Sequence, residues 1–110
     1  METKTVKIVV FVPETHSDVV RKAVGEAGAG KIGNYSHCTF SSRGQGRFMP
    51  LSGASPTIGE VGKSEVVDEE RIEFICDKDS LNKVIEAIKK VHPYKEVAFD
   101  VYPLLDIELP

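Results

Sequence analysis

Residues 4–12, KTVKIVVFV, predict the central strand of a sheet, because an extended strand of this sequence is apolar on both of its faces. One face carries Val6, Ile8, Val10 and Val12, and the other carries Val9 and Phe11. Pro13 ends the strand, since proline has no amide hydrogen to donate to a neighbouring strand. Such a strand is typical of the centre of a sheet that is covered on both sides. We therefore expect a sheet with helices on one face and a further layer on the other.

The residues that follow this strand predict a helix and then a second strand. Residues 15–18, THSD, fit a capping box, and a helical apolar stripe follows as far as Gly28. From Asn34 to Phe40 the side chains alternate, which predicts a strand that places His37 and Cys38 on opposite faces. Cys38 is then expected in the core, beside Phe40.

The second half of the chain predicts a long loop and three more elements. Residues 41–64 are rich in glycine, serine and proline, and a loop of this length is usually functional or packed against a partner subunit. Alternation predicts a strand over residues 65–76. An apolar stripe predicts a helix that Asp77 or Asp79 caps and that ends at His92-Pro93. Residues 97–102 predict a fourth strand, followed by a short tail at 104–110. The order βαββαβ indicates one α+β domain over residues 1–110, a ferredoxin-like sandwich.

Composition excludes several classes of function. The 110 residues carry a formal net charge of -3 without a basic stripe, which argues against nucleic-acid binding. No apolar run is long enough to cross a membrane, and the N-terminus has no signal-peptide pattern. The two cysteines, Cys38 and Cys76, fit free thiols in a reducing compartment, so we expect a cytoplasmic protein.

Two motifs suggest ligand chemistry. Residues 25–31, GEAGAGK, match the glycine and lysine spacing of a phosphate-binding loop, but Ile32 follows where serine or threonine belongs, and the segment leaves a helix instead of entering one. His37 and Cys38 are competent ligands for a divalent metal, with His92 or His16 as a third donor. A hydrogen-bonded structural histidine is the alternative for His37.

The charged residues of the second half have simpler explanations. The acidic residues between positions 65 and 70 are typical of a solvated strand entrance. Glu73 shares a strand face with Arg71, which suggests an ion pair across a subunit interface. Residues 92–96, HPYKE, place His92, Tyr94 and Glu96 after a helix and form a candidate ligand segment, although a histidine at a helix C-terminus also interacts favourably with the helix dipole.

A longer set of motifs resembles a known family. The motifs are residues 28–40 (GAGKIGNYSHCTF), 44–48 (GQGRF), 53–56 (GASP), 58–59, Gly62, 71–73 (RIE), 92–94 (HPY) and 102–103 (YP). In this order they resemble the inserted domain of the YqfO family, the Nif-three-like proteins known as dinuclear-metal-centre or type 2 GTP cyclohydrolase homologues. The sequence departs from the family pattern at Lys95 and Val97, where glutamate and proline are usual.

The resemblance implies a fold similar to the PII signalling proteins and the CutA family, which associate as trimers. A trimer would supply the missing cover for the second face of the first strand. In full-length members of the family the two metals are held by flanking domains, so the resemblance does not carry cyclohydrolase activity to these residues.

We therefore expect a non-enzymatic, homotrimeric binding or regulatory module for an unknown small ligand or protein partner. Its candidate binding residues are Tyr35, His37, Arg47, His92, Tyr94 and Glu96. One alternative is a CutA-like protein that binds a divalent metal through His37, Cys38 and His92. The other is a nucleotide-hydrolysing enzyme, which only the family's name suggests.

Overall fold

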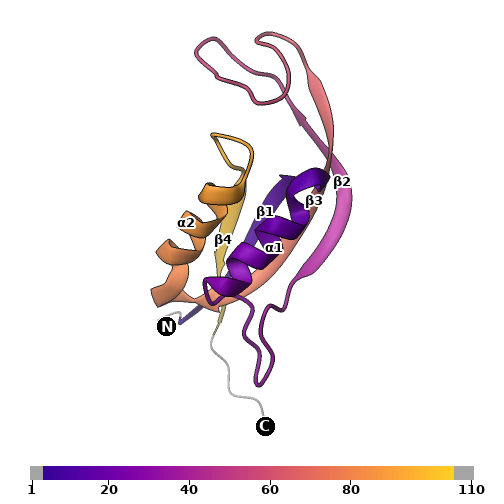
Figure 1. The fold of residues 1–110 in the computed structure, drawn as a ribbon. Coiled ribbons are helices and arrows are strands. Elements are labelled where there is room, and N and C mark those ends of the chain that lie inside the picture. The colour runs from indigo at the N-terminus through magenta and orange to yellow at the C-terminus, as the bar shows by residue number, and fades with distance from the viewer. Residues whose placement is uncertain (1–3, 106–110) are drawn as a thin grey trace.

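The computed structural model describes residues 4–105 as two helices packed on one face of a four-stranded antiparallel sheet (Figure 1). The strands are β1 (Thr5–Pro13), β2 (Phe40–Phe48), β3 (Glu65–Asp77) and β4 (Phe99–Pro103), in the spatial order β2-β3-β1-β4. The helices are α1 (Ser17–Glu26) and α2 (Leu81–Val91), each preceded by one short 3-10 turn. This is the predicted ferredoxin-like sandwich. Most of the tail expected at residues 104–110 lies outside the described part of the chain.

The core lies between the helices and the near face of the sheet. The apolar stripe of α2 contributes Val84 and Ile88, both fully buried, against Ile8 and Val10 of β1. The predicted two-sided burial of β1 is also confirmed, since Val9 on the opposite face is fully buried as well. No helix of residues 4–105 covers that opposite face, which we call the open face of the sheet (Figure 1). Among residues 4–105, no helix combines the length and the apolar character that crossing a membrane requires.

The second strand differs from the prediction, because β2 begins at Phe40, where the predicted strand was to end. Three glycines with positive φ angles, Gly28, Gly30 and Gly33, turn residues 27–39 into a compact hairpin instead. The hairpin is attached to the sheet by a 2.7 Å hydrogen bond from the Gly30 amide to the Ile75 carbonyl. The polar residues 41–48, expected in a loop, pair with β3 as an edge strand, so the loop itself spans only residues 49–64.

Both helix starts also differ from the prediction. The Thr15 hydroxyl lies 2.8 Å from Nδ1 of His16 and caps no backbone amide, so the predicted capping box does not form. The second helix likewise begins without the predicted aspartate cap, after a short 3-10 turn at Lys78–Ser80. Its predicted end at His92 is confirmed.

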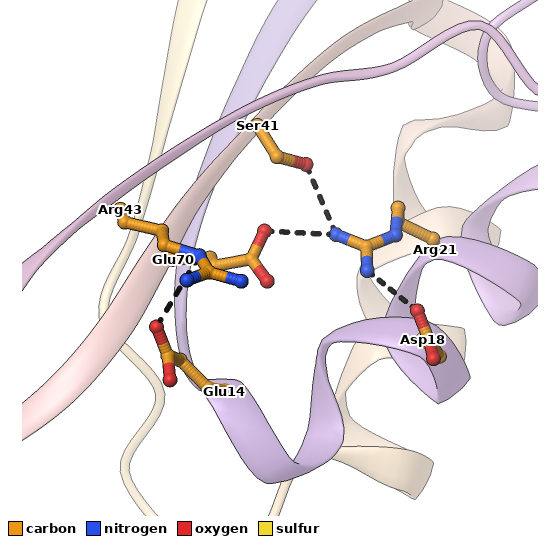
Figure 2. A network of polar contacts seen from close by, with 6 residues as sticks. All are labelled: Glu14, Asp18, Arg21, Ser41, Arg43 and Glu70. Atoms are coloured by element: carbon orange, nitrogen blue, oxygen red, sulfur yellow. Dashed lines mark hydrogen bonds and ion pairs between the residues drawn. The ribbon is translucent and has the colours of Figure 1, made fainter.

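An arginine network ties α1 to β2 and β3 (Figure 2). The guanidinium of Arg21 donates hydrogen bonds to Ser41 Oγ and Glu70 Oε2, both at 3.0 Å, and to Asp18 Oδ1 at 2.6 Å. Beside it, Arg43 of β2 lies 3.6 Å from the Glu14 carboxylate. The network holds the edge strand β2 against the body of the domain.

Replacing Arg21 with alanine should lower the free energy of unfolding by about 2 kcal/mol, because it leaves the half-buried Glu70 carboxylate without its charged donor. Chemical denaturation measures the loss. The control is Lys22→Ala, which removes only an exposed 3.9 Å ion pair with Glu26 and should cost less than about 0.5 kcal/mol. Equal losses in the two variants would contradict a structural role for the network.

Candidate functional site

A cavity of about 670 Å³ opens between the loop of residues 49–64 and the segment that leads from α2 to β4. Its walls are mainly apolar, formed by Phe11, Phe48, Met49, Leu51 and Ile58. The loop is held over this cavity by a 2.8 Å hydrogen bond from the Thr57 hydroxyl to the Pro93 carbonyl. A cavity of this size and composition is typical of a small-molecule site.

A second hollow of about 420 Å³ adjoins the first and shares four residues with it, namely Phe11, Gly46, Glu69 and Ala98. The register pairs Pro13 with Glu69 and Phe11 with Arg71, so these side chains alternate with the buried core positions of β1 and β3. Both hollows therefore lie on the open face of the sheet.

Glu69 is the polar group common to both hollows. Only 8% of the residue is exposed, and no lysine, arginine or histidine of residues 4–105 lies within ion-pair distance of its carboxylate. Burial raises the pKa of this carboxyl group, and the neighbouring Tyr94 hydroxyl partly opposes the rise. A buried carboxylate without a cation is costly, which makes Glu69 a candidate for binding one.

One glycine of β2, Gly46, makes room for this carboxylate. A Cβ atom on Gly46 would collide with the Glu69 carboxyl group, so the side chain can fold over this position only because it is glycine. Gly44, which is paired directly with Glu69 in the sheet, has open space where its Cβ would be. Gly46, which was predicted to lie in a loop, thus shapes the pocket from within a strand.

Tyr94 supplies the second polar group. Its hydroxyl is buried and makes no hydrogen bond of normal geometry among residues 4–105. Burial, followed by the charge of Glu69, raises the pKa of Tyr94 to about 12, so the phenol stays protonated in the physiological range. The ring packs edge-on against Phe48, with centroids 5.9 Å apart.

His92 holds Tyr94 in place from behind. Its Nε2 lies 2.8 Å from the Phe11 carbonyl oxygen, and its Nδ1 accepts a 3.0 Å hydrogen bond from the Tyr94 amide. These contacts fix a neutral imidazole with the proton on Nε2, and burial lowers its pKa, consistent with that state. Both ring nitrogens are occupied, so His92 positions the pocket and does not line it.

The structure brings together half of the sequence-predicted binding residues. Arg47, Tyr94 and Glu96 all line the larger cavity, and Lys95 lies beside them at one of the positions where the sequence departs from the family pattern. The Arg47 guanidinium donates to the Gln45 side chain at 3.3 Å.

Of the other three, His92 lies behind Tyr94, as described above. Tyr35 and His37 lie on the 27–39 hairpin, at the opposite end of the molecule from the 49–64 loop (Figure 1). Tyr35 is 75% exposed, and His37 adopts a φ of 60° with its imidazole against Gly25 of α1. Cys38 is half-buried and not in the core, and Phe40 is 67% exposed. The prediction that Cys38 lies in the core was therefore wrong.

The metal-ligand set proposed from the sequence does not come together. His37 bonds Ser36 Oγ at 2.9 Å on the hairpin, whereas His92 is buried beside Phe11 with both nitrogens used. Within residues 4–105, no group of three or more histidine, cysteine, aspartate or glutamate side chains is arranged to hold a metal ion.

Glu73 forms its ion pairs within the chain. Its carboxylate lies 3.4 Å from the Lys7 ammonium and 3.6 Å from the Arg71 guanidinium, so no second subunit is needed to neutralise it. The Arg71 guanidinium also lies 5.9 Å from the centre of the Phe11 ring. This cluster forms the floor of the open face beside the smaller hollow.

Replacing Glu69 with glutamine should stabilise the protein at neutral pH. Because the folded-state pKa is raised, the stability that comes from protonated Glu69 is complete below the ordinary pKa of 4.5 and is lost as the pH rises through the raised value. Glutamine cannot ionise, so the variant should melt a few degrees above the wild type at pH 7 and equal to it near pH 4. Asp68→Asn, on the exposed opposite side of β3, is the control. A Glu69→Gln variant that melts lower at pH 7 would contradict an uncompensated buried charge.

Comparison with known proteins gives relatives over most of the chain, although no family model matches it. The chain is 56% identical over 98 residues to a Halalkalibacterium halodurans protein named GTP cyclohydrolase 1 type 2 homolog. The match covers 89% of this chain and 26% of that protein. The chain thus spans about a quarter of the length of the curated relatives that it matches.

Solved structures show the same relationship and confirm the fold. A Bacillus cereus protein related to NIF3 superposes with a TM-score of 0.83 at 54% identity, over 94% of this chain and 26% of that one. The CutA protein of Archaeoglobus fulgidus gives 0.69 at 15% identity, over 94% and 87% of the two chains. GlnK of B. subtilis gives 0.61 at 17% identity, over 93% and 86%. The last two likenesses establish the fold alone.

Proposed function

Since this chain belongs to the NIF3/YqfO family over the segment that it shares with those proteins, we propose that it is a small-molecule-binding regulatory module and not an enzyme. The observation that carries the proposal is the open-face cavity, where a buried carboxylate and a buried hydroxyl without a normal hydrogen bond converge on apolar walls. Polar groups placed in this way fix the orientation of a ligand.

The module acts as a homotrimer in this proposal. No helix of the described part of the chain covers its open face, where Phe40 is 67% exposed and Tyr102 is 45% exposed. Large exposed apolar side chains on one face are typical of a contact surface. The fold is shared with CutA and GlnK, and a trimer built through the open face would place the Glu69 cavity at a boundary between subunits.

Two free thiols, one of them buried, fit a cytoplasmic location.

The experiment that tests binding is a ¹H–¹⁵N correlation NMR screen of a small-metabolite library against the full chain. We expect the amide shifts to be confined to the cavity, at residues such as Gly46, Arg47 and Tyr94. Hits that instead shift residues 30–38 would move the site to the hairpin, and the absence of any hit at the cavity would contradict the proposal.

One observation favours catalysis as a second candidate, because a carboxyl group with a raised pKa is also the property of a general acid or base. The relatives' name suggests GTP as the substrate. Homogeneous protein incubated with GTP and divalent metal should give no turnover above buffer. Turnover that disappears in Glu69→Gln would replace the binding module with an enzyme.

A further inference from the structure

We infer that the cavity takes a ligand with a cationic, planar N–H edge, of amidine or guanidine type, attached to a flat apolar body. The inference rests on the proposed function and names its ligand class. Glu69, which faces the cavity without an ion-pair partner within the described chain, is the group that would recognise the cation.

The geometry of the acceptors favours a planar donor edge. A carboxylate offers two oxygens side by side, which match the two parallel N–H groups of an amidine better than the point charge of an ammonium. The Tyr94 hydroxyl lies close enough to the same carboxylate for each group to shift the pKa of the other. It is buried without a hydrogen bond of normal geometry, so its oxygen remains available to accept from a further N–H group. A cation bound here neutralises a charge that the fold leaves buried.

Two of the nearby cations, Arg71 and Arg47, are engaged with other groups. Arg71, which lines the smaller hollow with Glu69, pairs with Glu73 at 3.6 Å, and Arg47 donates to Gln45 at 3.3 Å. Lys95 and Glu96 lie on the same wall, one positive and one negative, so they give the cavity no clear preference for an anion. The buried negative charge of Glu69 therefore favours a ligand with a positive charge.

The apolar walls of the cavity indicate that the rest of the ligand is a flat apolar ring. Phe11 and Phe48 present aromatic rings to the cavity, and Met49 and Leu51 of the loop are half-exposed or more in the chain alone. A flat ring between these side chains would remove them from water, while its N–H edge reaches Glu69.

The test uses three probes of one shape, benzamidine, benzamide and benzoate, titrated into the full chain by NMR at pH 7. We expect benzamidine to bind at least about tenfold more tightly than benzamide, and benzoate to bind most weakly. Glu69→Gln should remove the preference for benzamidine, whereas Asp68→Asn, which alters an exposed carboxylate on the other side of the strand, should retain it.

Equal affinity for benzamidine and benzoate in the wild type, or an unchanged preference in Glu69→Gln, would overturn the ligand class. The proposed function fails separately. If the metabolite screen shifts cavity amides but benzamidine does not bind, the module stands and the ligand class is wrong. If neither the screen nor any probe shifts the cavity, both are wrong.

Discussion

Replacing His92 with leucine should lower the free energy of unfolding by about 3 kcal/mol. The substitution removes the imidazole and leaves the Phe11 carbonyl and the Tyr94 amide unpaired in a part-buried region. Each unpaired group costs about 1–3 kcal/mol of stability. Chemical denaturation at pH 7.5 measures the loss. His16→Leu is the control, because within residues 4–105 the His16 side chain hydrogen-bonds only Thr15, in an exposed position, and its loss should cost under about 1 kcal/mol.

The same variant has a pH signature. Burial lowers the pKa of His92 in the folded state, so the stability that comes from neutral His92 is present above the ordinary value of 6.5 and is lost as the pH falls below it. The difference in stability between wild type and His92→Leu should therefore narrow below pH 6.5. A difference that stays constant from pH 7.5 to pH 5 would show that the imidazole is not held neutral.

Replacing Gly46 with alanine should weaken benzamidine binding about tenfold while the protein remains folded. The added methyl group occupies the space of the Glu69 carboxyl group, which must swing away from its acceptor position. The loss matches the removal of one charge-assisted hydrogen bond, about 1.4 kcal/mol for each tenfold change in affinity. The measurement is the same NMR titration that compares the three probes.

Gly44→Ala is the matched control for that variant. Gly44 lies two residues away on the same strand, and nothing occupies the space where its Cβ would be. Both variants carry the same cost of alanine in place of glycine in an edge strand, so only the contact with Glu69 differs between them. Equal weakening in the two variants would remove Glu69 from the site.

The parts of the fold that could be predicted from the sequence are those with a strong apolar pattern. The two-faced apolar character of β1 and the stripe of α2 both correspond to buried positions, and the ferredoxin-like order followed from them. The strand β2 has no such pattern, because an edge strand with polar and glycine residues looks like a loop until β3 is beside it. The hairpin at residues 27–39 shows the opposite case. Its side chains alternate along the sequence as in a strand, but within residues 4–105 no neighbouring strand pairs with it.

The candidate site was predicted only where a residue's neighbours in the sequence are also its neighbours in space. Tyr94 and Glu96 follow α2 directly and line the cavity as expected. Glu69 was interpreted as part of a solvated acidic stretch, because its burial depends on Gly46, 23 positions away in the chain. The one available signal was the register of β3, in which Glu69 falls on the same face as Arg71 and Glu73. His92 depends in the same way on a carbonyl of β1.

We propose that copies of this chain meet at the open face of the sheet and hold a small ligand there. Native mass spectrometry of untagged protein, taken directly from cells, tests it most directly. We expect a species of three times 12.1 kDa, with up to three copies of one small molecule that are lost in Gly46→Ala and retained in Gly44→Ala. A bare monomer of 12.1 kDa would contradict both the assembly and the site at its boundary.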